Sequence, residues 1–133
     1  MAHPDREEKS LSGFQDLLRS STALASGYLE RVHAADRAEW LLAALPEDAW
    51  RVFSDLSTED RAELLEHAED ELRRELIDRM SATDLRDLVE EMPSDEAVDL
   101  LEEADDRLAE DVLAAIPADI ARELRELSAY DSD

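Results

Sequence analysis

The sequence contains no cysteine and only two glycines, and aromatic residues make up 5 % of its 133 residues. The missing cysteines exclude disulfide bonds and thiolate-bound metal, which fits a reducing compartment. No apolar run approaches the roughly 18 residues of a membrane-spanning helix. The polar N-terminus also lacks the hydrophobic region of a signal peptide. We therefore expect a soluble, cytosolic chain.

Positive charge is scarce, with 14 Lys and Arg against 37 Asp and Glu and a formal net charge of −23. Nucleic acid and anionic lipid both bind concentrated positive charge, so neither is an expected partner, whereas cations suit this surface. Leu, Ile, Val and Phe together supply 31 of the 133 residues. That share lies just above the roughly 20 % typical of disordered chains, so we expect the chain to fold as one domain.

The usual catalytic motifs are also missing. There is no GxSxG, no glycine-rich phosphate loop and no HExxH. The three histidines are isolated: His3 is in the N-terminal tail, and His33 and His67 fall at expected helix ends. Carboxylate pairs are so numerous that none stands out for acid-base chemistry. The sequence predicts a protein that is not an enzyme.

Apolar residues recur three and four positions apart, as in Leu64, Leu65, Ala68 and Leu72, which is typical of amphipathic helices. No long segment alternates as a half-buried strand does. The sequence therefore predicts an all-α protein, with Trp40, Trp50 and Phe53 in its core or at an interface.

An internal repeat organises these helices. The expected helix ends step by 12 residues, with one step of 11, through His33, Leu45, Leu56, Ala68, Met80, Met92, Ala104 and Ile116. Shifting the chain by 36 residues aligns ten identical pairs, including Leu64 with Leu100 and Leu65 with Leu101. Proline or hydroxyl residues follow most of these ends, where they favour the start of the next helix.

Helices of about ten residues are marginal alone, so each must pack on its neighbours in a stacked superhelical array. We expect residues 1–20 to form a looser N-terminal helix or tail, interrupted near Gly13. Residues 21–128 form the repeat domain, and Leu64 and Leu100 occupy core positions.

Two acidic pairs stand out within the repeat. Glu59 and Glu63 are four residues apart, as are Asp95 and Asp99, and the 36-residue shift maps the first pair onto the second. In a regular stack these carboxylates would form an oxygen-rich surface suited to magnesium or calcium. A solvated acidic face without a ligand explains the same residues, and composition alone favours that alternative.

The chain resembles the cytosolic N-terminal domain of the MgtE family of magnesium transporters and channels from Leu29 to its end. Residues 29–36 are similar to that family's L-x-x-x-H-P-x-D entry to the first repeat, with Ala34 in place of proline. The units that begin at Leu45, Leu56, Met80 and Met92 are similar to the successive repeats that follow this entry in the family. Residues 129–133 look like the start of the family's linker to a pair of CBS domains.

The resemblance implies a right-handed superhelix (solenoid) of short antiparallel helices. It implies a magnesium-sensing regulatory domain that docks on the CBS domains when magnesium bridges two acidic surfaces, which closes the pore. Matched to the family pattern, Glu63, Asp95 and Asp99 are the metal ligands, and Glu59 follows by repeat symmetry alone. Magnesium binding would be weak and would need the partner domain.

The implied partners are the CBS and membrane domains of the same transporter, a homodimer at full length, with this part of the chain on the cytoplasmic side of the membrane. Two alternatives stay open. One is a helical-repeat adaptor similar to flagellar motor switch proteins, which binds a basic or helical partner without metal. The other is a structural acidic solenoid of a salt-tolerant cell.

Overall fold

The computed structural model describes residues 9–131, and the side chains of residues 9–128. Over this part of the chain it contains helices and no strand, which confirms the all-α prediction. The helices are α1 (Leu11–Ser20), α2 (Thr22–Leu29), α3 (Ala34–Leu42), α4 (Pro46–Asp55), α5 (Thr58–His67), α6 (Asp70–Asp78), α7 (Ala82–Glu91), α8 (Ser94–Glu103), α9 (Asp106–Ala115) and α10 (Ala118–Asp131).

The 12-residue period holds throughout the repeat. From α2 to α10 each helix begins 12 residues after the one before it, at positions 22, 34, 46 and so on to 118. The predicted junctions follow: His33 and Leu45 are N-caps, and Leu56, Ala68, Met92, Ala104 and Ile116 are C-caps. Hydroxyl caps act where expected, since the side chains of Ser57 and Ser81 accept the amide protons of Asp60 and Asp84 at 3.1 Å.

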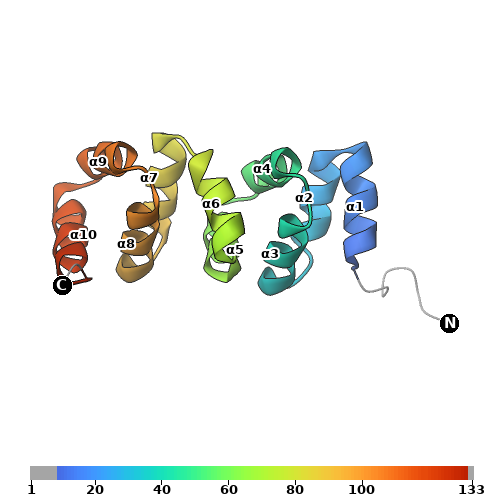
Figure 1. Cartoon of the computed structure of the whole chain (residues 1–133), viewed down its shortest axis with the longest axis horizontal. Helices are drawn as coiled ribbons and strands as arrows, with labels where there is room; N and C mark the ends of the chain where they lie inside the picture. Colours follow the sequence, from blue (N-terminus) through green and yellow to red (C-terminus); the bar gives the residue numbers. More distant parts are fainter. Residues whose placement is uncertain (1–8, 132–133) are drawn as a thin grey trace.

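The helices follow one another along the long axis of the molecule, with α1 and α10 at opposite ends (Figure 1). Helices two apart in the sequence pack side by side: α2 on α4, α3 on α5, α5 on α7, α7 on α9 and α8 on α10. Helix α6 is the exception, because it packs on α3 and α4 and has little contact with α8.

The core repeats with the same period. The seventh and eighth positions of successive helices are buried, as Leu64 and Leu65 are in α5 and Leu100 and Leu101 in α8. This confirms Leu64 and Leu100 as core residues, each with no exposed surface. Helices α3 to α8 each contribute such a buried pair to one continuous hydrophobic core, and α2, α9 and α10 each contribute one buried residue of the pair. Short helices stabilise one another in this way.

The N-terminal segment is more regular than predicted. Helix α1 runs through Gly13 without a break, and Phe14 is fully buried, so the predicted interruption near Gly13 is wrong. The Ser10 side chain caps the Gly13 amide at 3.1 Å, which stabilises the first turn. The Tyr28 hydroxyl would lie 2.6 Å from a Cβ at Gly13, so glycine permits this close approach.

Two predictions fall partly outside the described residues. His3 is not among them, and neither are residues 132–133 of the expected linker. Residues 129–131 continue α10 in their backbone, so the linker predicted to begin at residue 129 is helical over those three residues.

Candidate functional site

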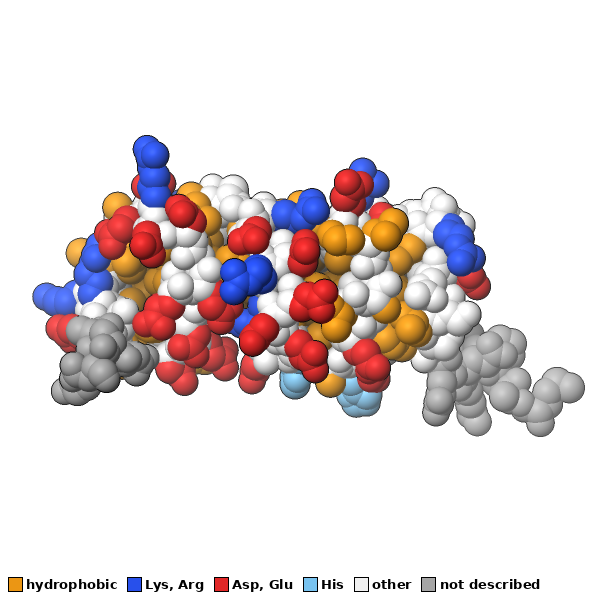
Figure 2. All heavy atoms as spheres, viewed as in Figure 1, with side chains coloured by type: hydrophobic (Ala, Val, Ile, Leu, Met, Phe, Trp, Pro, Cys, Tyr) orange, Lys and Arg blue, Asp and Glu red, His pale blue; other side chains and the backbone are white. Residues whose placement is uncertain are grey.

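The predicted acidic residues lie on two equivalent helices. Helices α5 and α8 are 36 residues apart at both ends, so Glu59 and Glu63 hold the same positions in α5 as Asp95 and Asp99 hold in α8. All four side chains are exposed. On the face that Figure 2 shows, acidic side chains are dense over α5 and α8.

The structure brings only some of these residues together. A groove of about 280 Å³ separates the end of α5 and the start of α6 from α8, and Asp99 lines it. The groove is lined by Glu66, Ala68, Arg73, Met92, Glu96, Asp99 and Glu103. Asp95 lies beside Glu96 on α8, close enough to act on its charge. Glu63 is not among the lining residues, and it is Glu66, three residues further along α5, that approaches α8.

Glu96 is the electrostatic centre of the groove. Partial burial raises the pKa of Glu96, and the nearby carboxylates of Glu66, Asp95 and Asp99 raise it further. Arg73 lowers this pKa but does not cancel the other effects. Negative charge therefore exceeds positive charge here, and a cation would relieve the repulsion.

Arg73 is already engaged by other groups. Its Nε and Nη2 atoms donate to the two carboxylate oxygens of Glu103, each at 2.9 Å, and its Nη1 donates to the carbonyl oxygen of Leu65. Among the described residues, Glu66, Glu96 and Asp99 form no salt bridge with a lysine or arginine. We call Glu66, Asp95, Glu96 and Asp99 the acidic cluster.

The acidic cluster has the donor chemistry of a magnesium site without the geometry of a complete one. Carboxylate oxygens suit Mg²⁺, which keeps several water ligands and is commonly held by one or two carboxylates. Within residues 9–128, no group of three or more His, Asp or Glu side chains is placed to hold a metal ion. Glu63, Asp95 and Asp99 therefore do not converge on one point in this chain.

Sequence reasoning missed Glu66, Glu96 and Arg73. The available signal was Arg73 itself, which occupies the fourth position of its helix, as Arg37 and Arg61 do. The same position in the other repeats holds the apolar residues Ala25, Ala49, Leu85, Ala97, Ala109 and Ala121. A charged residue at a core position of a periodic chain indicates a local polar contact.

The three arginines share one role. Each donates to the carbonyl eight residues earlier, in the last turn of the preceding helix: Arg37 to Leu29 at 3.1 Å, Arg61 to Phe53 at 3.1 Å, and Arg73 to Leu65. The last carbonyls of a helix lack intrahelical partners, so a guanidinium there satisfies them and opposes the helix dipole.

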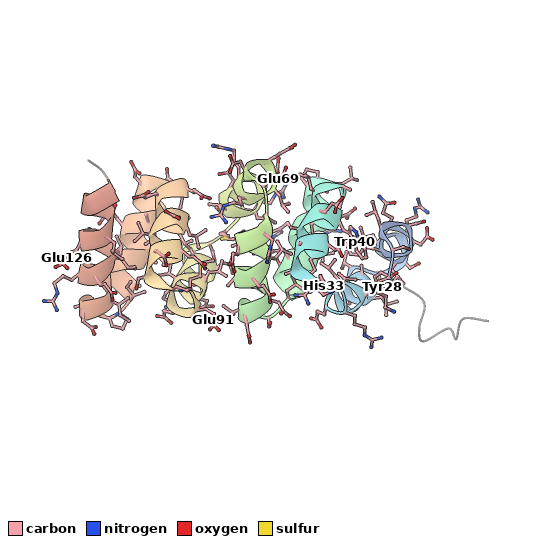
Figure 3. The ribbon with its side chains drawn as sticks, turned by 90° about the horizontal axis from the view of Figure 1, so that it is seen from below. Tyr28, His33, Trp40, Glu69, Glu91 and Glu126 are labelled. Atoms are coloured by element: carbon pink, nitrogen blue, oxygen red, sulfur yellow. The ribbon has the colours of Figure 1, made fainter. Side chains whose placement is uncertain are left out.

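Histidine and aromatic residues lie where the sequence predicted. His33 is the N-cap of α3 and His67 ends α5. Trp40 is buried, and Tyr28 stacks on it with ring centroids 6.2 Å apart (Figure 3). Phe53 is buried in the core, and the partly buried Trp50 packs beside it with ring centroids 5.8 Å apart.

No helix within the described part of the chain has the length and apolar character needed to cross a bilayer.

Comparison with known proteins identifies the family. No curated protein matches the chain. The chain is similar in fold to a protein whose structure is described as "Crystal structure of the soluble part of a magnesium transporter", with a TM-score of 0.73 and 20 % sequence identity. The match covers 90 % of this chain and 48 % of that one, so the chain spans about half of that protein's length. Residues 32–133 match the family described as the MgtE intracellular N domain. This match covers most of the repeat, and the chain therefore belongs to the MgtE intracellular N domain family.

Proposed function

We propose that this chain is the magnesium-sensing regulatory domain of a magnesium transporter. In this proposal its acidic surface docks on the CBS domains of the same transporter when magnesium lies between the two surfaces. Docking takes place on the cytoplasmic side of the membrane, in a homodimeric transporter, and it closes the pore. The family and the fold shared with the soluble part of a magnesium transporter support a place in such a protein.

The observation that carries the proposal is the uncompensated charge of the acidic cluster. The raised pKa of Glu96, caused first by partial burial and then by Glu66, Asp95 and Asp99, indicates repulsion even in the free domain. A second acidic surface brought against this one would add to the repulsion. Divalent cations at the contact offset that cost, so docking depends on the magnesium concentration.

Each proposed ligand has a limited role. Asp95 and Asp99 are exposed one turn apart on α8 and can each offer one oxygen directly or through a water ligand of magnesium. Glu63 is exposed on the equivalent turn of α5 and would contact an ion held mainly by the partner. This division predicts weak magnesium binding by the domain alone.

A binding measurement with the CBS fragment tests the proposal. Calorimetry measures the affinity of this chain for a separate fragment that contains the CBS domains. The MgCl₂ concentration is varied through the millimolar range, and NaCl is adjusted to hold the ionic strength constant. We expect affinity to rise with magnesium in the wild type. The double variant Asp95→Asn with Asp99→Asn should lose most of that dependence while keeping its helical circular dichroism.

The matched control is Glu71→Gln with Glu75→Gln. These two exposed acids are also four residues apart, on α6, and their removal changes the net charge by the same amount. We expect this control to keep the magnesium dependence. Equal affinity with and without magnesium in the wild type would contradict the proposal and favour the metal-independent adaptor.

A further inference from the structure

An apolar groove lies on a different part of the surface from the acidic cluster. Two adjoining hollows, of about 390 and 150 Å³, lie between α6 and the helices α3 and α4, and they share Leu42 and Leu72. We call the combined feature the apolar groove, and its apolar lining includes Ala35, Ala38, Leu42, Ala44, Pro46 and Leu72. Helix α6 packs on both α3 and α4, and the groove follows this junction.

Two leucines at this groove depart from the repeat. Leu42 is the ninth residue of its helix and is 38 % exposed, whereas that position in the next helices holds Ser54, Glu66 and Asp78. Leu45 is 71 % exposed and lies between the lining residues Ala44 and Pro46.

Leu45 also occupies an N-cap position. The same position holds Ser57, Glu69, Ser81, Pro93 and Asp105 in later repeats. Leucine cannot cap a helix, and exposing it gains nothing for folding. The fold therefore does not explain Leu45, and it leaves more than a third of Leu42 exposed.

The rim of the groove is acidic. Glu39 and Glu69 line one hollow and Glu71 and Glu75 line the other, and all four are exposed. Among the described residues, none of these carboxylates pairs with a lysine or arginine, and His67 is the one basic side chain in the lining. A ligand of this groove must therefore combine apolar and positively charged groups.

The shape of the wall indicates a helix. Ala35, Ala38 and Leu42 follow the spacing i, i+3, i+7 along α3, which places them in one stripe about 10 Å long. An amphipathic helix with its own apolar residues at that spacing can lie along such a stripe. We propose that the apolar groove binds a short amphipathic helix of a partner protein, with an apolar face and flanking Lys or Arg. This proposal is independent of the magnesium function.

A synthetic helix serves as the probe. The labelled peptide carries leucine at i, i+3, i+4 and i+7 and lysine elsewhere, and its scrambled version keeps the composition and charge. Binding to the chain is measured by fluorescence anisotropy at physiological salt. We expect the scrambled peptide to bind about tenfold more weakly, because only the ordered helix presents an apolar face.

Variants of the chain locate the binding site. Leu42→Ser with Leu45→Ser introduces the residues that the next repeat carries at Ser54 and Ser57, so this variant should fold at least as well as the wild type. We expect it to weaken peptide binding about tenfold. Leu24→Ser removes a leucine that is 59 % exposed on α2, away from the groove, and should leave binding unchanged.

Charge variants separate this proposal from magnesium sensing. Glu71→Gln with Glu75→Gln should weaken peptide binding, and Asp95→Asn with Asp99→Asn should not. Equal binding of the two peptides, or no effect of the Leu42 and Leu45 change, would overturn the proposal. Sedimentation showing a wild-type dimer that this change dissociates would also overturn it, because a second copy of the chain would then occupy the groove.

Discussion

Replacing Arg61 by alanine will lower the free energy of unfolding by about 2 to 4 kcal/mol. The Arg61 side chain donates to the carbonyl oxygens of Phe53, at 3.1 Å, and Ser54 in the last turn of α4. Its guanidinium also lies 5.7 Å from the centre of the Phe53 ring. A hydrogen bond from a charged donor contributes about 1.5 to 3 kcal/mol, and a cation-π contact about 0.5 to 1 kcal/mol. Two such hydrogen bonds and the cation-π contact sum to about 3.5 to 7 kcal/mol. The freed carbonyls regain water, which reduces the expected loss to about 2 to 4 kcal/mol.

The control for charge is Arg51→Ala. Arg51 is exposed on α4, so its replacement makes the same change in net charge, and it should cost under about 0.5 kcal/mol. Two further variants divide the effect: Arg61→Lys keeps the charge without the planar fork, and Arg61→Met keeps the apolar stem alone. Both should be less stable than the wild type and more stable than Arg61→Ala.

Urea unfolding followed by far-ultraviolet circular dichroism, at one fixed NaCl concentration, measures each free energy. The interpretation that Arg61 stabilises the last turn of α4 is wrong if Arg61→Ala and Arg51→Ala lower the free energy of unfolding equally. It is also wrong if lysine replaces Arg61 without loss.

Other predictions concern the core and the titrating carboxylates. Leu64→Ala should cost about 2 to 5 kcal/mol, because the side chain is fully buried, whereas Leu24→Ala should cost under about 0.5 kcal/mol in the same urea assay. The pKa of Glu96 is raised by burial and by its acidic neighbours, so the wild type loses stability as pH rises through that pKa. Glu96→Gln should therefore stabilise the chain at neutral pH, and equal stability of the two at pH 7 would contradict this. The hydrogen bond and charge of Arg125 lower the pKa of Glu110, so this pair stabilises the fold above the ordinary carboxyl pKa, and the effect disappears as pH falls through the folded value. Arg125→Gln should return the Glu110 pKa to its ordinary range in a carboxyl NMR titration.

The regular part of this fold was predictable because one period controls it. A helix every 12 residues requires a helix end, a cap and a buried pair at fixed intervals. The capping residues Ser57 and Ser81 and the core residues Leu64 and Leu100 show this pattern in the sequence. The all-α class, the junctions and the core followed from this pattern. The exposure of the acidic pairs and their equivalence between α5 and α8 followed as well.

The exceptions to the period were not predictable in the same way. Gly13 indicated a break, but the Ser10 side chain caps its amide, and the Ser10 amide donates to the Tyr28 hydroxyl 18 residues further along the chain, which keeps this turn helical. The groove around Glu96 includes a contact of Arg73 with Glu103, 30 residues further along the chain. Such contacts join residues whose separation does not follow the 12-residue period, so the sequence pattern does not predict them.

The serial packing of the helices has a mechanical consequence. Each helix is held almost entirely by near neighbours, so a pull on the two ends passes through every junction in turn. The weakest junction sets the force at which such a chain of modules yields. Between α6 and α8 the contact is slight, so at this level the packing of α5 on α7 carries most of the load, and the rod should bend or part here before its other junctions do.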